Sequence, residues 1–121
     1  MDELVRAAKC LGDSARVRVL NLLMQRECCV CEVMDVLGIS QVNASRYCTS
    51  LNDAGFLKMH KEGRWKHYRV DFDACSPSLR DMLDSVQKTA LHDPVLEDDV
   101  RRLALCRRRS GCRVQESFAH A

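Results

Sequence analysis

The spacing of apolar residues changes once along this chain, and the change restricts the folds open to it. As far as Leu51 the apolar residues recur at helical spacing, whereas residues 56–61 and 66–70 have the character of β-strands. The segment between these runs, residues 62–65, contains Gly63 and is short enough to be the turn of a hairpin. The sequence therefore predicts a mainly α fold with one small β-hairpin.

Helices are predicted on both sides of the hairpin. Ser14 and Ser40 are expected N-caps, because a serine hydroxyl can accept a hydrogen bond from an N–H group of the first turn. Gly38 is expected to end a helix, since glycine readily adopts the left-handed conformation found there. The predicted helices cover residues 3–11, 14–25, 31–37, 41–54, 77–91 and 95–106.

The length of the chain limits it to one domain, because 121 residues can enclose one hydrophobic core but not two. We expect residues 1–106 to form this domain and residues 107–121 to be a flexible tail that contains arginines and Cys112. No run approaches the ~18 apolar residues of a membrane span, and the first residues do not resemble a secretory signal. We therefore expect a cytoplasmic protein without membrane contact.

Charge is distributed unevenly along the chain. Residues 41–70 carry 6 basic and 2 acidic side chains, a net charge of +4, whereas residues 71–99 carry 2 and 8, a net charge of −6. A basic segment of this kind suits a face that meets phosphate groups. An ordinary solvated surface could carry the same charges, so charge alone does not decide between the two interpretations.

Two short helices joined by residues 38–40, and followed by a basic hairpin, have the order of a winged helix-turn-helix. The N-terminal half of the second helix of such a unit enters the major groove of DNA. Glutamine and asparagine can pair with adenine and arginine with guanine, while a helix N-terminus and basic hairpin residues can hold phosphate. Taken singly, these polar residues would also suit an ordinary exposed helix, but their order favours DNA. The predicted contacts to double-stranded DNA are Ser40, Gln41, Asn43, Ser45, Arg46, Lys61, Arg64 and Lys66.

Eight cysteines are many for a chain expected in the reducing cytoplasm, where disulfides are rare. Three of them, Cys28, Cys29 and Cys31, lie close together at the start of a predicted helix. The positive end of the helix dipole should favour thiolates there, and thiolates prefer soft ions. We predict that these three cysteines bind a soft metal or metalloid ion.

The remaining cysteines are assigned by their neighbours. Cys48 lies on the apolar side of its helix and is expected in the core. Cys106 and Cys112 lie among arginines, which should lower their thiol pKa. These two could complete the ion site, form a redox disulfide or have no role. An ion that takes three sulfurs needs a third ligand beside Cys29 and Cys31, and adjacent residues of an extended segment point to opposite sides. The alternatives to Cys28 as the third ligand are therefore Cys106, Cys112 and Cys10.

The first and last helices carry more apolar surface than a core of this size needs. We therefore expect a symmetric homodimer through residues 3–11 and 78–91, which would also pair two DNA half-sites. The alternative is that both helices complete the core of a monomer. The last helix offers Asp81, Asp84 and His92 without a pair of histidines, so an imidazole-rich zinc site is not expected on it. No catalytic arrangement stands out, so an enzyme is not expected.

Four segments resemble the signature of one protein family. Residues 27–33, Glu-Cys-Cys-Val-Cys-Glu-Val, are similar to Glu-Leu-Cys-Val-Cys-Asp-Leu, and residues 40–46, Ser-Gln-Val-Asn-Ala-Ser-Arg, to Ser-Gln-x-x-x-Ser-Arg. Residues 11–16 resemble Leu-Ala-Asp-x-x-Arg, and residues 63–69 resemble the family's wing. In this combination the chain resembles the ArsR-type (ArsR/SmtB) metalloregulatory repressors.

The resemblance implies a dimeric winged-helix repressor of a resistance or efflux operon. Such a repressor needs no cofactor to bind operator DNA and leaves it on binding an inducer. Cys29 and Cys31 match the two signature cysteines. Arsenite-responsive members often have a third cysteine three residues further along, and here Met34 occupies that place. Arsenite is the first expected inducer, with antimonite, Cd²⁺, Pb²⁺, Zn²⁺ or thiol oxidation and persulfide as alternatives. A zinc-stabilised protein-interaction module that does not bind DNA is the alternative outside this class.

Overall fold

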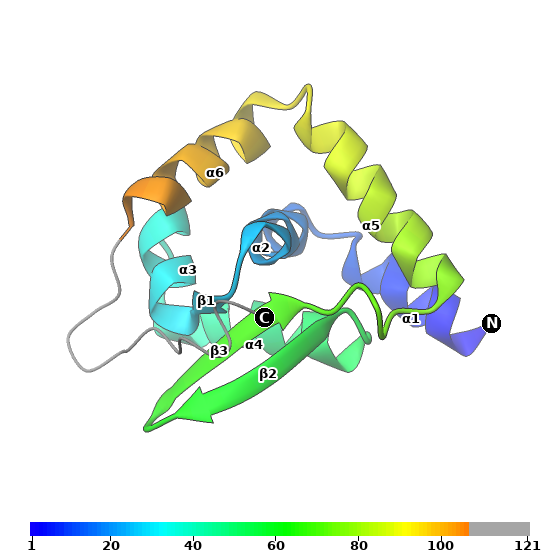
Figure 1. Ribbon diagram of the computed structural model, residues 1–121, viewed down its shortest axis with the longest axis horizontal. Helices are drawn as coiled ribbons and strands as arrows, with labels where there is room; N and C mark the ends of the chain where they lie inside the picture. Colours follow the sequence, from blue (N-terminus) through cyan, green and yellow to red (C-terminus); the bar gives the residue numbers. More distant parts are fainter. Residues whose placement is uncertain (107–121) are drawn as a thin grey trace.

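Helix α2 (Ser14–Gln25) forms the centre of the fold, and its buried leucines are at most 1% exposed. Helices α5 and α6 form an arch over one side of α2, while the sheet and α4 lie on the other side (Figure 1). The computed structural model describes residues 1–106, so the predicted tail, with Cys112, lies outside the described residues. The other elements are α1 (Asp2–Cys10), β1 (Cys28–Cys29), α3 (Val30–Leu37), α4 (Gln41–Asp53), β2 (Leu57–Glu62), β3 (Trp65–Val70), α5 (Pro77–Ala90) and α6 (Pro94–Leu105).

The sheet has three antiparallel strands in the order β1-β3-β2. Strands β2 and β3 pair from Leu57 opposite Val70 to Glu62 opposite Trp65, and this pairing is the predicted hairpin. Strand β1 was not predicted, because two residues are too few to show an alternating pattern. It is held by β3 alone, so its existence depends on the tertiary fold.

Most helix boundaries agree with the prediction. The N-cap of α2 differs from it, and the N-cap of α3 is a residue for which no cap was predicted. The prediction that Ser14 caps α2 is wrong: Asp13 is the cap, and its Oδ1 accepts a hydrogen bond of 2.8 Å from the N–H of Ala15. A carboxylate one residue earlier reaches the first free N–H groups of the helix, which explains the difference. Helix α3 begins at Val30, so Cys29 is its N-cap.

The helix-turn-helix and the wing have the predicted order. Gly38 ends α3 in the left-handed conformation, with a φ of 65°, and the chain then turns into α4. The hydroxyl oxygen of Ser40 accepts a hydrogen bond from the N–H of Asn43 and caps α4 as predicted. The mainly α, winged helix-turn-helix fold class is therefore confirmed.

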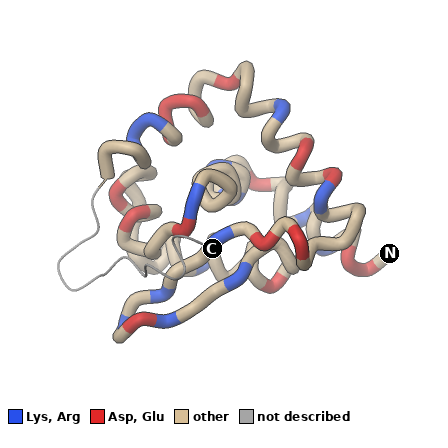
Figure 2. The backbone as a smooth tube through the Cα atoms, viewed as in Figure 1, with Lys and Arg blue, Asp and Glu red and all other residues tan. Residues whose placement is uncertain are grey.

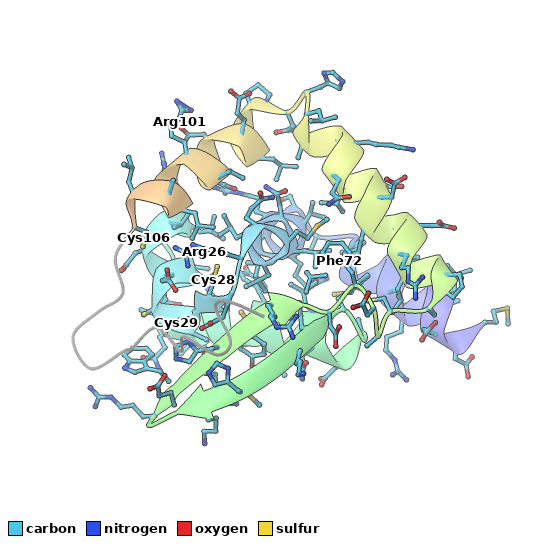
Figure 3. The ribbon with its side chains drawn as sticks, viewed as in Figure 1. Arg26, Cys28, Cys29, Phe72, Arg101 and Cys106 are labelled. Carbon is cyan, nitrogen blue, oxygen red and sulfur yellow. The ribbon has the colours of Figure 1, made fainter. Side chains whose placement is uncertain are left out.

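Helix α6 returns across the molecule and packs against α2 and α3. Arg18 of α2 donates two hydrogen bonds, of 2.8 and 2.9 Å, to the buried carboxylate of Asp99. At the other end, Arg102 donates to the carbonyl oxygen of Val36 at 3.4 Å. These contacts bring the last described residue, Cys106, to the side of the molecule where α3 lies (Figure 3). Within residues 1–106, every helix falls short of the length and apolarity needed to cross a lipid bilayer.

Candidate nucleic-acid interface and thiol site

Helix α4 has one buried side and one side that is open to a ligand. Ala44, Cys48 and Leu51 are fully buried, and they attach α4 to the core. Gln41 and Arg46 are exposed on the other side. Between these extremes Asn43 and Ser45 are partly exposed. The five residues predicted on this helix and its cap therefore all retain surface through which DNA could be contacted.

The wing carries its basic residues on the outside. Lys61 and Lys66 are exposed and lie opposite each other in the pairing of β2 with β3. Arg64 at the turn is exposed as well, and its guanidinium carbon lies 5.8 Å from the centre of the Trp65 ring. Figure 2 marks the Lys and Arg positions along the hairpin. Like charges placed side by side in this way favour an anionic partner over a bare surface.

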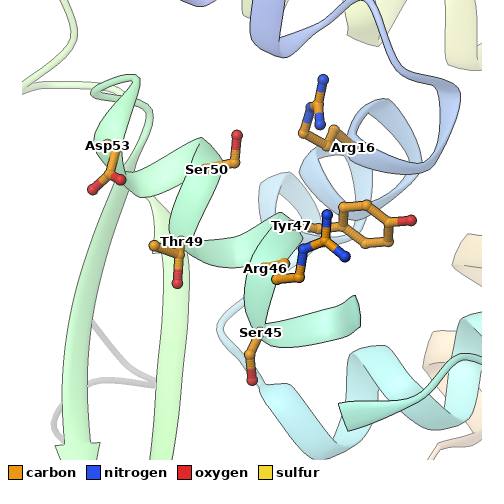
Figure 4. Close-up of a pocket in the computed structure, with 7 residues that line it drawn as sticks. All are labelled: Arg16, Ser45, Arg46, Tyr47, Thr49, Ser50 and Asp53. Atoms are coloured by element: carbon orange, nitrogen blue, oxygen red, sulfur yellow. The ribbon is translucent and has the colours of Figure 1, made fainter. Parts of the chain in front are cut away.

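A hollow beside α4 brings a further cation to this surface (Figure 4), an arginine that belongs to the motif of residues 11–16 but was not among the predicted DNA contacts. Arg16 of α2 reaches it from the side, with its Nε donating a hydrogen bond of 2.6 Å to the carbonyl oxygen of Cys10. Arg46 and Tyr47 of α4 line the same hollow. The other lining residues are Ser45, Thr49, Ser50 and Asp53. Two guanidinium groups against the one carboxylate of Asp53 leave the hollow a net positive charge, which together with its hydroxyls suits a phosphate of a DNA backbone.

The pairing of β1 with β3 divides the cysteine triplet between two environments. Cys28 lies opposite Tyr68, and both side chains belong to the main core. Cys29 lies opposite His67 on the other face of the sheet, where its side chain forms a small buried cluster with Cys31 and Trp65. The structure therefore brings Cys29 and Cys31 together, while the Cys28 side chain points into the core.

Cys29 caps the helix on which Cys31 lies. The N–H of Cys31 donates to the Sγ of Cys29 at 3.3 Å, and the N–H of Cys29 donates to Oε1 of Glu32 at 2.9 Å. The second oxygen of Glu32 forms a 2.7 Å ion pair with Arg26 (Figure 3 labels Arg26, Cys28 and Cys29). The two sulfurs are therefore positioned by the start of α3 itself, at the positive end of its dipole.

Cys106 follows α6 and lies near the same helix (Figure 3). Burial raises the pKa of the Cys106 thiol, and the charges of Glu32, Asp35 and Cys31 raise it further, against the opposing effect of Arg26. The pKa of this thiol is thus raised and not lowered as expected, because partial burial and two carboxylates outweigh Arg26. The arginines on which the expectation depended follow Cys106 in the sequence and lie outside the described residues. Cys106 packs against the main core, and Cys31 is close enough to affect its ionisation.

Cys48 and Cys10 are both buried, away from the start of α3. Cys48 is fully buried as predicted, and burial raises its pKa to about 12. The Sγ of Cys10 lies 3.6 Å from the hydroxyl oxygen of Ser50, at the contact of α1 with α4. This position separates Cys10 from the cluster of Cys29, Cys31 and Trp65.

Comparison with known proteins identifies the family. A family model described as bacterial regulatory protein, arsR family, matches residues 13–58. The arsenic resistance transcriptional regulator ArsR1 of Pseudomonas putida is 33% identical over an alignment of 99 positions, which covers 79% of this chain and 73% of that protein. The chain belongs to the ArsR family. The family assignment made from the sequence motifs is thereby confirmed.

Other ArsR-family relatives differ in the ion that their names mention. The arsenical resistance operon repressor of Escherichia coli is 36% identical over 67 residues, 54% of this chain and 57% of that protein. A cadmium resistance regulator, the CadC homolog of Staphylococcus aureus, is 31% identical over 70 residues, 57% of this chain and 58% of that protein. The family is thus settled, whereas the ion has to be argued from the cysteines.

The solved structure of Mb0332 from Mycobacterium bovis shares the fold. It is described as a homodimeric winged helix-turn-helix DNA-binding domain and a possible ArsR-family regulator. The TM-score is 0.60 at 26% identity, covering 76% of this chain and 83% of that one. This ArsR-family chain is therefore a winged-helix transcription regulator, and the prediction of that class is confirmed.

The burial of the cysteines predicts an order of chemical modification. In the folded protein we expect iodoacetamide to label Cys106 before Cys48, because Cys106 is partly exposed whereas Cys48 is buried with a pKa of about 12. Since the Cys106 pKa is also raised, its labelling should be slow at neutral pH and accelerate as the pH rises. Peptide mass spectrometry over time measures both rates. Equal rates in the folded protein, as expected only in urea, would contradict this assignment.

Proposed function

We propose that this ArsR-family chain is a cytoplasmic repressor that binds operator DNA as a homodimer and releases it when trivalent arsenic binds cysteine thiolates. The observation that carries the proposal is the cluster of Cys29 and Cys31 at the start of α3. The two thiols are soft ligands, and the helix that they begin, α3, packs directly on α4. Binding of an ion would therefore affect the position of α4, the proposed reading helix. The arsenic resistance regulators among the relatives support arsenite as the first candidate.

For the third sulfur we propose Cys106 in preference to Cys28. Cys28 is fully buried on the opposite face of the sheet from Cys29, so bringing it to the cluster would require the strand to turn over. Cys106 is partly exposed, is already within electrostatic reach of Cys31, and follows the last turn of α6 in extended backbone. A rotation of the Cys106 side chain is the smaller change. Cys112 and Cys10 are the less favoured candidates.

The proposed release of DNA starts at the first turn of α3. An ion held by Cys29 and Cys31 would pull on the cap of α3 and disturb the hydrogen bonds of Cys29 with Cys31 and Glu32. Because α3 packs on α4 and β1 pairs with the wing, both proposed DNA-binding elements share this starting point. Linkage requires that DNA weaken ion binding by the same factor by which the ion weakens DNA binding.

The proposed DNA surface combines the predicted residues with Arg16. Gln41, Asn43 and Arg46 would read base edges, while Ser40, Ser45 and Arg16 would hold the phosphate backbone. Lys61, Arg64 and Lys66 of the wing would add phosphate contacts. The predicted residues of α4 and of the hairpin retain exposed surface, which supports these roles.

The proposed homodimer uses α1 and α5. Leu4 and Val5 of α1 are 46% and 43% exposed, which leaves apolar surface available for a partner. A shallow groove between α2 and α5 is lined by Leu11, Val17, Met82, Ser85, Val86 and Thr89. The homodimeric state of Mb0332 supports a dimer, while the choice of α1 and α5 depends on this exposed apolar surface.

Cadmium is the second candidate inducer, because a cadmium resistance regulator is also among the relatives. Cd²⁺ and Pb²⁺ accept thiolates, as do trivalent arsenic and antimony, so the two alternatives share the same residues. Two measurements would distinguish these ions. Sulfur-to-metal absorption would report the number of sulfurs bound to each ion, and competitive binding would show which ion displaces the other.

Arsenite titration against a protein–DNA complex tests the proposal. With a duplex selected from random DNA, we expect arsenite to lower the affinity of the wild type by roughly 5- to 150-fold, the usual range of allosteric coupling. The variant Cys29→Ser/Cys31→Ser should bind the duplex normally and ignore arsenite, because its two central ligands are gone. Fluorescence anisotropy under reducing conditions measures both affinities.

Single variants identify the third sulfur in the same assay. Cys106→Ala should weaken the response more than Cys28→Ala, and Cys75→Ala, a buried cysteine outside the proposed site, serves as the matched control. A normal arsenite response of Cys29→Ser/Cys31→Ser would refute the proposed site. Release by an oxidant alone would point instead to a thiol-redox sensor.

The wing should contribute salt-dependent affinity. Affinity for DNA falls as salt rises, and we expect Arg64→Gln/Lys66→Gln to make this dependence shallower. The slope of log affinity against log salt should decrease in magnitude by about 0.9 for each DNA phosphate that the variant no longer neutralises. Arg101→Gln on α6, an exposed arginine on another part of the surface, is the control and should leave the slope unchanged. An unchanged slope in the wing variant would exclude the wing from the DNA surface.

The dimer should depend on the exposed face of α1. We expect Leu4→Glu/Val5→Glu to weaken dimerisation by at least about tenfold, because it would bury unpaired charges in the interface. Val95→Glu, at an apolar residue of α6 that is 51% exposed, is the control. Sedimentation equilibrium gives the dissociation constants, and equal values for the two variants would exclude α1 from the interface.

A further inference from the structure

Three side chains with metal-binding atoms meet where the wing joins the rest of the protein. Glu27 precedes β1, His60 lies on β2 and His67 lies on β3. One ligand atom from each residue lies within 4.8 Å of the others. Glu27 and His67 are buried, and His60 is partly exposed. Three separate segments of the chain thus contribute donors to one place, which the sequence motifs did not indicate.

The hairpin register holds the two histidines together. His60 lies directly opposite His67 in the pairing of β2 with β3, so both side chains project from the same face of the sheet. Their rings are stacked, with centroids 4.9 Å apart and an interplanar angle of 21°. The Nδ1 atom of His67 lies 2.6 Å from Oε1 of Glu27. His60 adds a third donor beside the buried pair of Glu27 and His67.

The donor set is that of zinc-type sites. Imidazole nitrogen and carboxylate oxygen bind Zn²⁺ at about 2.0–2.2 Å, and two histidines with one glutamate form a known class of three-ligand site. Ligand atoms of a tetrahedral site lie roughly 3.3 Å apart, so the three groups need to converge from their present spacing of up to 4.8 Å. Rotations of side chains and small shifts of the hairpin supply a movement of this size. A water molecule would complete a four-coordinate site of this kind.

We propose that Glu27, His60 and His67 bind a divalent cation of the Zn²⁺ type, at a site distinct from the cysteine cluster. Binding displaces the proton shared by the nitrogen of His67 and the carboxylate of Glu27, which passes to solvent. The ion connects the segment before β1 to both strands of the wing, and so restrains the wing relative to α3. Cys29 lies opposite His67 in the pairing of β1 with β3, so the two sites are neighbours on one face of the sheet.

A cobalt titration of the full-length chain tests this site. The Cys29→Ser/Cys31→Ser background removes the neighbouring thiolates, and Co²⁺ replaces Zn²⁺ because it absorbs visible light. We expect one tightly bound Co²⁺ with d–d bands and without a thiolate charge-transfer band, and we expect Zn²⁺ to displace it. His60→Gln in this background should lower the affinity by roughly 10- to 100-fold or more, since even partners of metal ligands have effects of that size.

Two further variants make the test specific. His92→Gln changes an exposed histidine outside the cluster and should leave the affinity unchanged. Glu27→Gln keeps the shape of the ligand, removes its charge and should weaken binding as His60→Gln does. As a second readout, Zn²⁺ should raise the melting temperature of the background and of His92→Gln, but not of His60→Gln. Absence of Co²⁺ binding in the background, a sulfur charge-transfer band, or equal affinities of the two histidine variants would each overturn the proposal.

Discussion

The pairing of the two-residue strand β1 with β3 is the contact on which the arrangement of both sites depends. It joins the segment that begins α3 to the wing, although the two lie about forty residues apart in the sequence. The same pairing turns Cys28 toward the core and Cys29 toward Trp65, because successive residues of a strand face opposite sides. Through β1 the start of α3, where Cys29 and Cys31 lie, is joined directly to the wing.

Short elements in close contact would connect the proposed ion site directly to the proposed DNA surface. Cys29 caps α3, α3 packs on α4, and β1 pairs with the wing, so the two proposed DNA-binding elements share one small region of structure. Packed elements of this kind shift between discrete arrangements more readily than they deform. A displacement at the start of α3 therefore suffices in principle to move the reading surface, and no long chain of intermediates is needed.

Helix α6 adds a feature beyond the helix-turn-helix and wing. The buried carboxylate of Asp99 and its two hydrogen bonds from Arg18 attach α6 to α2. Through this attachment a cysteine far from Cys31 in the sequence comes within its electrostatic reach. Partial burial and nearby carboxylates then give the Cys106 thiol a raised pKa, although the sequence around it is rich in arginine.

The sequence by itself determined the helix order, the hairpin and the family, because apolar spacing, glycine positions and contiguous motifs are local properties. It also predicted the burial of Cys48 from the apolar side of one helix. Only the tertiary structure decided which way each cysteine of the triplet points, whether Cys106 lies near α3, and that Glu27, His60 and His67 meet. These outcomes depend on strand register and on the packing of distant elements, which no local pattern encodes.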